Sequence, residues 1–280
     1  MNKITKILIL FIFLIFICIC GTKADDYIYD DPLNLINDAK ISQHYYTYKG
    51  TKIYYSETYE NQDKEAPSSI ILVLHGGIQR SNEHIMKHIT NPALQSLISY
   101  VRTNKVKVLI IAPQYPLAVD KKHYRYPQKY NNVIMQLYKD KIKQYNIPKD
   151  RFFVIGTCVG GIALNNLLNT YSDFFSKAAF VASKTIDYSK FDKKKFKTKL
   201  YFVQGDRDSL KTRIAAINAL KKMSVKTNLE VLKDTNHART LEMDVGYPDK
   251  MWKWLFKYEY TSYLEILKIY CLKLINKIRH

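Results

Sequence analysis

Cysteine is scarce in this chain, with four in 280 residues, and two of them, Cys18 and Cys20, lie in an apolar N-terminal run. So low a number excludes the small secreted proteins that disulfides hold together. The other two, Cys158 and Cys271, could form a single disulfide, and Cys158 has an alternative role described below. Asn-X-Ser/Thr sequons and nucleic-acid-binding motifs are also missing, so neither N-glycosylation nor nucleic-acid binding is implied.

Linkers rich in proline, glycine or serine are absent, as are internal repeats and low-complexity tracts. A chain of this length without such linkers fits one large domain. The hydrophobic fraction of 47% is enough for a sizeable core. The sequence therefore favours a single globular domain over an array of small modules.

The apolar N-terminal run is too short for a typical membrane-spanning helix, which needs roughly 20 apolar residues. It follows a basic start at Lys3, extends over residues 7–19 and precedes small residues at Thr22 and Ala24. That order is typical of a secretory signal peptide. We predict a signal peptide over residues 1–24, and a protein that is secreted or resides in the lumen of the secretory or endolysosomal pathway. An uncleaved anchor is the alternative.

Acidic residues are outnumbered by basic ones, 25 against 44, and the formal net charge is +19. Lysines cluster between residues 190 and 199, and residues 259–280 have apolar side chains at helical spacing with a basic face. The simplest interpretation is a solvated lysine-rich surface and a terminal amphipathic helix packed on the domain. The alternative is contact with anionic surfaces, such as membranes, through these two segments.

Patterns of buried strands alternate with helical patterns along most of the chain. Continuous apolar runs, such as residues 69–74, indicate strands buried on both faces. The predicted strands span residues 51–58, 69–74, 106–112, 151–155, 178–182, 200–204 and 229–232, and the predicted helices span 81–103, 130–145, 162–171 and 212–223, with another near residue 248. This alternation predicts an α/β domain with a mostly parallel sheet covered by helices on both faces. We predict that it spans residues 51–258 and follows a polar, tyrosine-rich extension over residues 25–50.

The strongest chemical signal is the segment 156–161, Gly-Thr-Cys-Val-Gly-Gly, between a predicted strand and a predicted helix. A nucleophile elbow has this form because the sharp reversal projects the central side chain and needs glycine where strand and helix approach, here Gly156 and Gly160. A helix N-terminus beside a thiol also favours the thiolate. Cys158 is therefore a candidate nucleophile, and an inert buried cysteine in a glycine-rich turn is the alternative.

Three further features fall in order along the chain. His75-Gly76-Gly77 follows the strand at residues 69–74, a strand with a Gly-X-X-Asp turn ends at Asp208, and a loop carrying His237 follows the last predicted strand. With the elbow, these features resemble the α/β-hydrolase superfamily over about residues 51–258. The resemblance implies an α/β-hydrolase fold with the chain order nucleophile, acid, histidine.

The resemblance also assigns roles to residues of this chain. It implies a triad of Cys158, Asp208 and His237, with Asp206 as the fallback acid. Backbone N–H groups of Gly77 and Val159 would form an oxyanion hole. The most similar relatives would be compact secreted esterases of the polyhydroxybutyrate-depolymerase and feruloyl-esterase type, and dienelactone hydrolases, which use cysteine as the nucleophile.

The implied function is hydrolysis of a small-molecule or polymeric carboxylic ester, or of a thioester, through a covalent acyl-enzyme. No metal or organic cofactor is implied. Three residues depart from the usual pattern: Cys158 replaces serine, Gln204 stands where histidine often precedes the acid turn, and Asn236 stands where glycine often precedes the histidine. The alternative function is ligand or partner binding by a catalytically inactive protein of the same fold.

Other chemical candidates have simpler interpretations. His84 and His88 have helical spacing and could share a metal, but no third ligand is evident, so a solvated helix face is the simpler interpretation. His75 is interpreted as a structural hydrogen-bonding residue. The segment 183–199, where lids are inserted in this family, is short, which predicts that a large lid is absent.

Overall fold

The computed structural model describes residues 41–60, 66–77, 87–116, 128–183, 196–242 and 244–257. The predicted signal peptide (1–24) and terminal helix (259–280) lie outside these residues. So do His84, the side chain of His88, Cys271 and most of the segment predicted to lack a lid.

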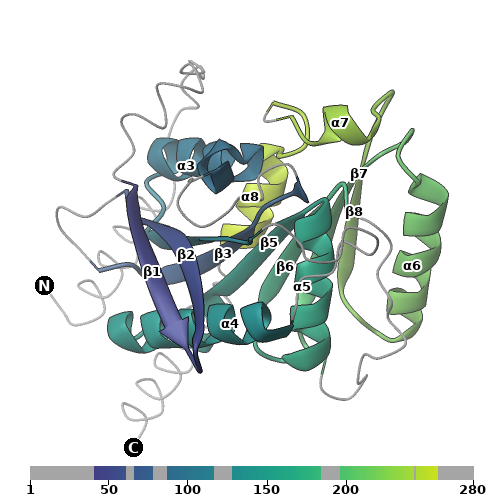
Figure 1. The fold of residues 1–280 in the computed structure, drawn as a ribbon. Helices are drawn as coiled ribbons and strands as arrows, with labels where there is room; N and C mark the ends of the chain where they lie inside the picture. The colour runs from purple at the N-terminus through teal and green to yellow at the C-terminus, as the bar shows by residue number, and fades with distance from the viewer. Residues whose placement is uncertain are drawn as a thin grey trace, which may run out of the picture. The chain divides into compact units, whose positions relative to one another are not determined.

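Among the described residues, eight strands form one sheet in the order β1-β2-β4-β3-β5-β6-β7-β8 (Figure 1). The strands are β1 (Ser42–Tyr48), β2 (Thr51–Thr58), β3 (Ser69–Leu74), β4 (Val108–Gln114), β5 (Phe152–Thr157), β6 (Lys177–Val181), β7 (Lys199–Gly205) and β8 (Thr227–Leu232). β2 runs antiparallel to both of its neighbours, β1 and β4. From β4 to β8 every neighbouring pair is parallel. The predicted α/β class with a mostly parallel sheet is confirmed.

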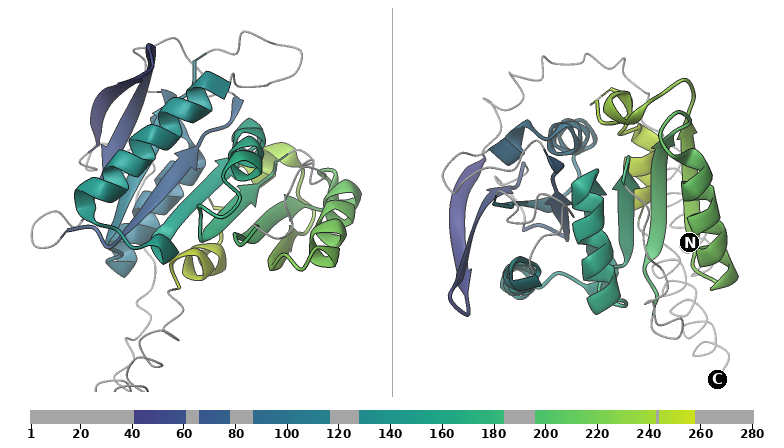
Figure 2. Two further views of the ribbon diagram at one scale, coloured as in Figure 1. Left: turned by 90° about the horizontal axis from the view of Figure 1, so that it is seen from below. Right: turned by 45° about the vertical axis from the view of Figure 1, so that its right-hand side comes forward.

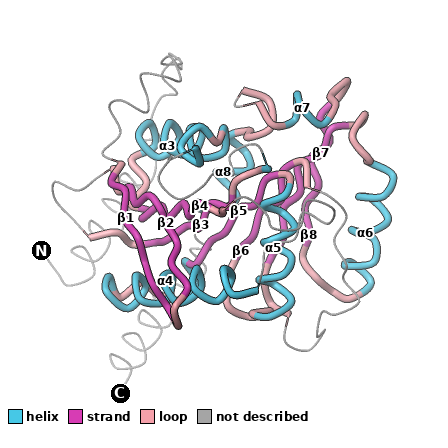
Figure 3. The backbone as a smooth tube through the Cα atoms, viewed as in Figure 1, coloured by secondary structure: helices cyan, strands magenta, loops and turns pink. Residues whose placement is uncertain are grey.

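Helices cover both faces of this sheet (Figure 2). They are α3 (Pro92–Asn104), α4 (Gln128–Tyr145), α5 (Val159–Thr170), α6 (Leu210–Lys222), α7 (His237–Thr240) and α8 (Asp249–Phe256), with short 3-10 helices η2 (Lys87–Thr90) and η3 (Lys149–Arg151). Figure 3 shows the strands as one continuous set with helices around it. None of the helices within the described residues is long and apolar enough to cross a membrane.

The all-apolar sequence of β3 is explained by its two buried faces. Successive side chains of a strand point to opposite faces. Ile70 and Leu72 pack in the core formed with α4, α5 and α6, whereas Ile71 and Val73 pack in the core formed with α3 and α8. A strand at the centre of the sheet therefore has no polar face, as the continuous apolar run predicted.

Two sequence-based boundaries were wrong. The domain does not begin at residue 51, because β1 pairs with β2 along its whole length, from Ser42 opposite Glu57 to Tyr48 opposite Thr51. The polar side chains of β1 concealed it, because an edge strand exposes most of them. The strand predicted to end at residue 112 continues to Gln114, and Pro113 lies within it, opposite Tyr55 in β2. It is tolerated because the pairing of β4 with β3 has already ended at Ile111.

The carboxyl ends of the parallel strands set the location of the functional residues. The segments that follow β3, β5, β7 and β8 carry Gly77, Cys158, Asp208 and His237, respectively. Parallel strands direct these segments to one edge of the sheet, where α/β proteins bind their ligands.

We expect Tyr138→Phe to destabilise the domain. The buried Tyr138 hydroxyl lies 2.9 Å from the carbonyl oxygens of Ile70 and Phe153 and accepts the Phe153 N–H at 3.1 Å, so it links α4 to both central strands. Its removal leaves buried backbone groups unsatisfied and should lower the free energy of unfolding by about 1–3 kcal/mol. Urea denaturation measures the change, with the part-exposed Tyr130→Phe as the matched control. Equal losses in both variants would contradict this role.

Candidate active site

Cys158 occupies a strained position between β5 and α5. It is the single residue between the strand and the helix. Its backbone has φ 51° and ψ −113°, a conformation that residues other than glycine rarely adopt. Helix α5 begins at the next residue, so its positive N-terminal end lies beside the thiol. Cys158 is partly buried and carries a free thiol. The elbow predicted from the sequence is therefore formed.

The glycines of the elbow allow backbone segments to meet without side chains between them. A Cβ on Gly156 would lie 2.6 Å from the Gly160 carbonyl oxygen, and a Cβ on Gly160 would overlap the carbonyl oxygen of Leu74 at the end of β3. Any larger residue at either position must move a backbone rather than a flexible side chain. This close approach brings the start of α5 against the end of β3.

A continuous chain of hydrogen bonds joins the three residues predicted as a triad. The Cys158 Sγ lies 3.3 Å from the Nε2 atom of His237. On the other side of the ring, Nδ1 of His237 lies 2.8 Å from the Oδ2 atom of Asp208. The carboxylate accepts from Nδ1, so Nε2 faces the sulfur and can exchange a proton with it.

The structure brings Asp208, rather than the fallback Asp206, to the histidine. The Asp206 carboxylate accepts the backbone N–H groups of Asp234 and Thr235 at 2.9 and 3.0 Å. These hydrogen bonds lower the pKa of Asp206. Asp206 thereby ties the acid turn to the loop that leads to His237, and it contributes to the site only by holding that loop.

Asn236 explains one departure from the family pattern. Its side-chain oxygen accepts the Arg239 N–H at 3.0 Å and caps the short helix α7, whose first residue is His237. The asparagine that replaces the usual glycine thus orients the turn that carries the histidine.

Two backbone N–H groups point at the sulfur of Cys158. They belong to Gly77, after β3, and to Val159, at the start of α5. These are the two donors predicted for an oxyanion hole. Gly160 lets the start of α5, which carries Val159, approach the end of β3, which leads to Gly77.

The surroundings of the thiol favour its ionised form. Burial opposes ionisation of Cys158, but the hydrogen bond and positive charge of His237, together with the N–H groups of Gly77 and Val159, outweigh it and lower the thiol pKa. In turn, the hydrogen bond to Cys158 and the one to Asp208 outweigh burial and raise the pKa of His237 to about 9. The site therefore favours a thiolate–imidazolium pair over two neutral groups.

Tyr247 is a neighbour of this pair that the sequence did not reveal. Its phenol is buried, and burial together with the nearby charge of Cys158 raises its pKa well above the ordinary value. It stays protonated wherever the pair is formed. No motif marks Tyr247, because it follows the last strand in a loop and reaches the elbow only through folding.

His75 is a structural residue, as interpreted from the sequence. It is buried, its Nδ1 lies 2.7 Å from the Gly76 carbonyl oxygen, and its Nε2 accepts the Tyr115 N–H at 2.9 Å. It therefore fastens the turn that carries Gly77 to the end of β4.

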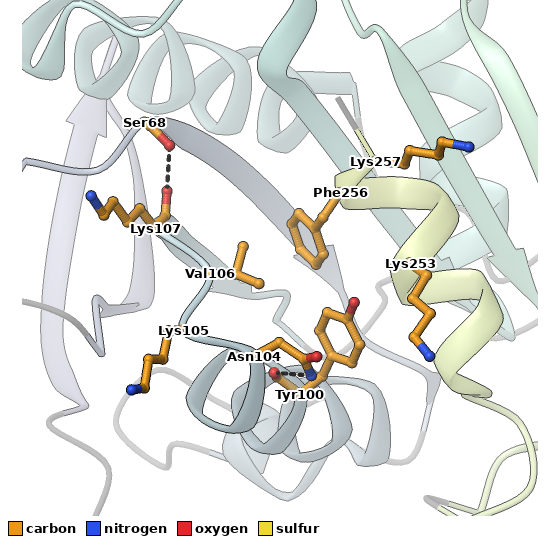
Figure 4. A pocket seen from close by; sticks show the side chains of 9 residues that line it. All are labelled: Ser68, Tyr100, Asn104, Lys105, Val106, Lys107, Lys253, Phe256 and Lys257. Carbon is orange, nitrogen blue, oxygen red and sulfur yellow. Dashed lines mark hydrogen bonds between the residues drawn. The ribbon is translucent and has the colours of Figure 1, made fainter. Parts of the chain in front are cut away.

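Metal-ligating side chains form no candidate metal centre in the described part of the chain. No cluster of three or more His, Cys, Asp or Glu side chains could hold a metal ion there. A pocket of about 570 Å³ lies at the amino end of β3 and β4, at the edge opposite Cys158, and Tyr100 and Phe256 are among its lining residues. Its rim is rich in lysine, but the lysine side chains do not converge on its centre (Figure 4).

Solved structures of similar fold include esterases and other hydrolases. The chain matches a thermostable esterase with a TM-score of 0.66 at 15% identity, over 80% of this chain and 64% of that one. It thus spans less than two thirds of that esterase. It also matches the fluorophosphonate-binding serine hydrolase F of Staphylococcus aureus (TM-score 0.57, 16% identity, 78% and 98% of the two chains) and a ferulic acid esterase (0.55, 15%, 71% and 91%).

No protein-family model and no curated protein matches this sequence. At identities this low, the structural matches define the fold rather than the activity. Together with the observed strand order, they show that the chain has the α/β-hydrolase fold, which confirms the class that the elbow and the ordered motifs predicted.

We expect Cys158 to react with iodoacetamide faster than an ordinary thiol at neutral pH. Its lowered pKa moves the midpoint of the rate–pH profile below that of an ordinary thiol. In His237→Gln the midpoint should move up, because burial then acts with less opposition. Peptide mapping by mass spectrometry follows Cys158 apart from Cys271, with the exposed His44→Gln as the control. Identical profiles in wild type and His237→Gln would refute the ion pair.

Proposed function

We propose that this protein hydrolyses carboxylic esters or thioesters, with Cys158 as the nucleophile, His237 as the acid–base and Asp208 as its partner. The observation that carries the proposal is the hydrogen-bonded chain from the Cys158 sulfur through His237 to Asp208. It lies at the carboxyl edge of an α/β-hydrolase sheet, with two backbone N–H groups facing the sulfur.

Acylation begins from the thiolate–imidazolium pair. The thiolate attacks the carbonyl carbon, a C–S bond forms, and the carbonyl oxygen takes up the negative charge. The N–H groups of Gly77 and Val159 then donate to this oxygen instead of to the sulfur. His237 Nε2 gives its proton to the leaving alkoxide or thiolate as the C–O or C–S bond of the substrate breaks, which leaves an acyl thioester on Cys158.

Deacylation uses the same groups in reverse. Neutral His237 accepts a proton from water, whose oxygen attacks the thioester carbon. When the tetrahedral intermediate collapses, the bond to Sγ breaks and the carboxylic acid leaves. The thiolate and the imidazolium are restored, and Asp208 keeps the ring in one tautomer throughout.

Structural neighbours support this reaction class. Two of the three matched structures named above are esterases, and the third is a serine hydrolase. Their fold is compatible with the proposed chemistry, and small-molecule esters are therefore the first substrates to test. The thiolate of Cys158 is itself a good leaving group, so in the tetrahedral intermediate of acylation it competes with the leaving group of the substrate. Substrates that also have a good leaving group, such as activated esters and thioesters, are therefore favoured.

We expect mature protein to hydrolyse members of a panel of p-nitrophenyl esters and acyl thioesters. In Cys158→Ala, kcat/KM should fall at least about a thousandfold because the nucleophile is gone. Cys158→Ser should recover part of the ester hydrolysis. Cys271→Ala controls for the loss of a thiol elsewhere. A folded wild type without activity on any of these substrates would instead indicate a binding protein on a hydrolase fold.

Secretion is part of this proposal, on the basis of residues 1–24. Expression of the full chain in a secreting host should yield protein whose first residue is Asp25. Mass spectrometry of the N-terminal peptide measures it. Retention of residues 1–24 on membranes would indicate an uncleaved anchor.

A further inference from the structure

Two buried polar side chains lie behind the acid Asp208. Gln204 in β7 and Arg213 in the first turn of α6 have exposed fractions of only 2% and 3%. Buried amide and guanidinium groups are costly unless they are hydrogen-bonded, so their partners show what they hold in place.

Gln204 forms hydrogen bonds directly with the acid Asp208. Its Nε2 donates to the Asp208 Oδ2 at 2.8 Å and also to the Asp208 backbone carbonyl oxygen. The same Oδ2 accepts Nδ1 of His237, also at 2.8 Å. One carboxylate oxygen thus receives hydrogen bonds from the histidine on one side and the glutamine on the other.

Arg213 determines which way the glutamine amide faces. Its Nε donates to the Oε1 atom of Gln204 at 3.3 Å. A guanidinium has only donors, so the amide oxygen must face it and the amide nitrogen must face Asp208. A reversed amide would set donor against donor at Arg213 and acceptor against acceptor at Asp208.

Arg213 also reaches the elbow. Its Nη2 donates to the Ser183 carbonyl oxygen and to Oγ of Ser183, the latter at 3.0 Å. Ser183 packs on Gly161, where an added Cβ would overlap the serine Cβ. The guanidinium also lies 5.1 Å from the centre of the Phe202 ring. One buried side chain therefore contacts the residue that supports the elbow and the residue that holds the acid.

We propose that Arg213 is a positioning residue for the acid Asp208, acting through Gln204, and that it fixes the acid turn relative to the elbow that carries Cys158. The proposal rests on the function proposed above. Arg213 does not contact the reacting atoms. It holds the carboxylate against His237, so that the ring presents Nε2 to the sulfur.

Loss of this support should weaken the thiolate–imidazolium pair. If the Asp208 carboxylate rotates away, His237 loses one of the hydrogen bonds that raise its pKa. The pair then forms over a narrower pH range, and less thiolate is present at low pH. Among the described residues, the phenol of Tyr247 is also a titratable group influenced by Cys158, and none of these substitutions changes it.

The test compares the pH profile of Cys158 alkylation in Arg213→Met and Gln204→Met with that of wild type. Arg213→Met keeps an apolar stem of similar length but removes every donor. Gln204→Met keeps a side chain of similar length, adds no charge and removes the donor to Asp208, so it reports on the network even if Arg213→Met does not fold. The matched control is Arg207→Met, since Arg207 lies in the same turn but is exposed and paired with Asp234.

We expect the midpoint of the rate–pH profile to move up by about one pH unit in both variants, which is about a tenfold loss of rate at pH values below both midpoints. At those pH values the rate in Arg207→Met should stay within about twofold of wild type. Destabilised variants with an unchanged profile would overturn the proposal, because a merely structural role leaves the thiol unaffected. Alkylation needs no substrate, so an inactive wild type would refute the esterase but leave this test valid. In an active wild type, kcat should fall more than KM rises.

Discussion

The contact of Gly160 with the carbonyl oxygen of Leu74 is the constraint on which the site depends. It brings the first turn of α5 against the end of β3. Cys158 is then forced to positive φ, and its sulfur meets the N–H groups that follow two different strands. Without that approach, the thiol would be an ordinary buried cysteine, and neither the ion pair nor the oxyanion site would have its geometry.

A second constraint closes the opposite side of the site. The end of β7 and the loop after β8 meet where a Cβ on Gly205 would overlap the carbonyl oxygen of Thr235. Asp206 then accepts backbone N–H groups of the same loop. The acid and the histidine therefore come from neighbouring strands whose loops are fastened together, while the nucleophile comes from the centre of the sheet.

The residues that depart from the usual α/β-hydrolase pattern lie in the segments that meet at this site. Asn236 caps the turn of the histidine, and Gln204 supplies a donor to the acid. A cysteine suits a site in which the resting state carries separated charges, because a thiol loses its proton far more readily than a serine hydroxyl. The same backbone amides can hold the charge first on sulfur and then on the substrate oxygen.

Local sequence determined much of this protein. Strand burial explains the apolar runs of β3 to β7, and backbone sterics explain the elbow glycines. The order of Cys158, Asp208 and His237 was implied by the resemblance to α/β-hydrolases. The edge strand β1 was missed because its exposed side chains carry no apolar pattern. The choice of Asp208 over Asp206, and the roles of Gln204, Arg213 and Tyr247, were decided only by tertiary structure. Most of those contacts join residues on different elements, and the spacing of residues along the sequence does not define the direction in which each side chain points. A hydrogen bond needs a specific distance and angle, which the folded chain alone provides.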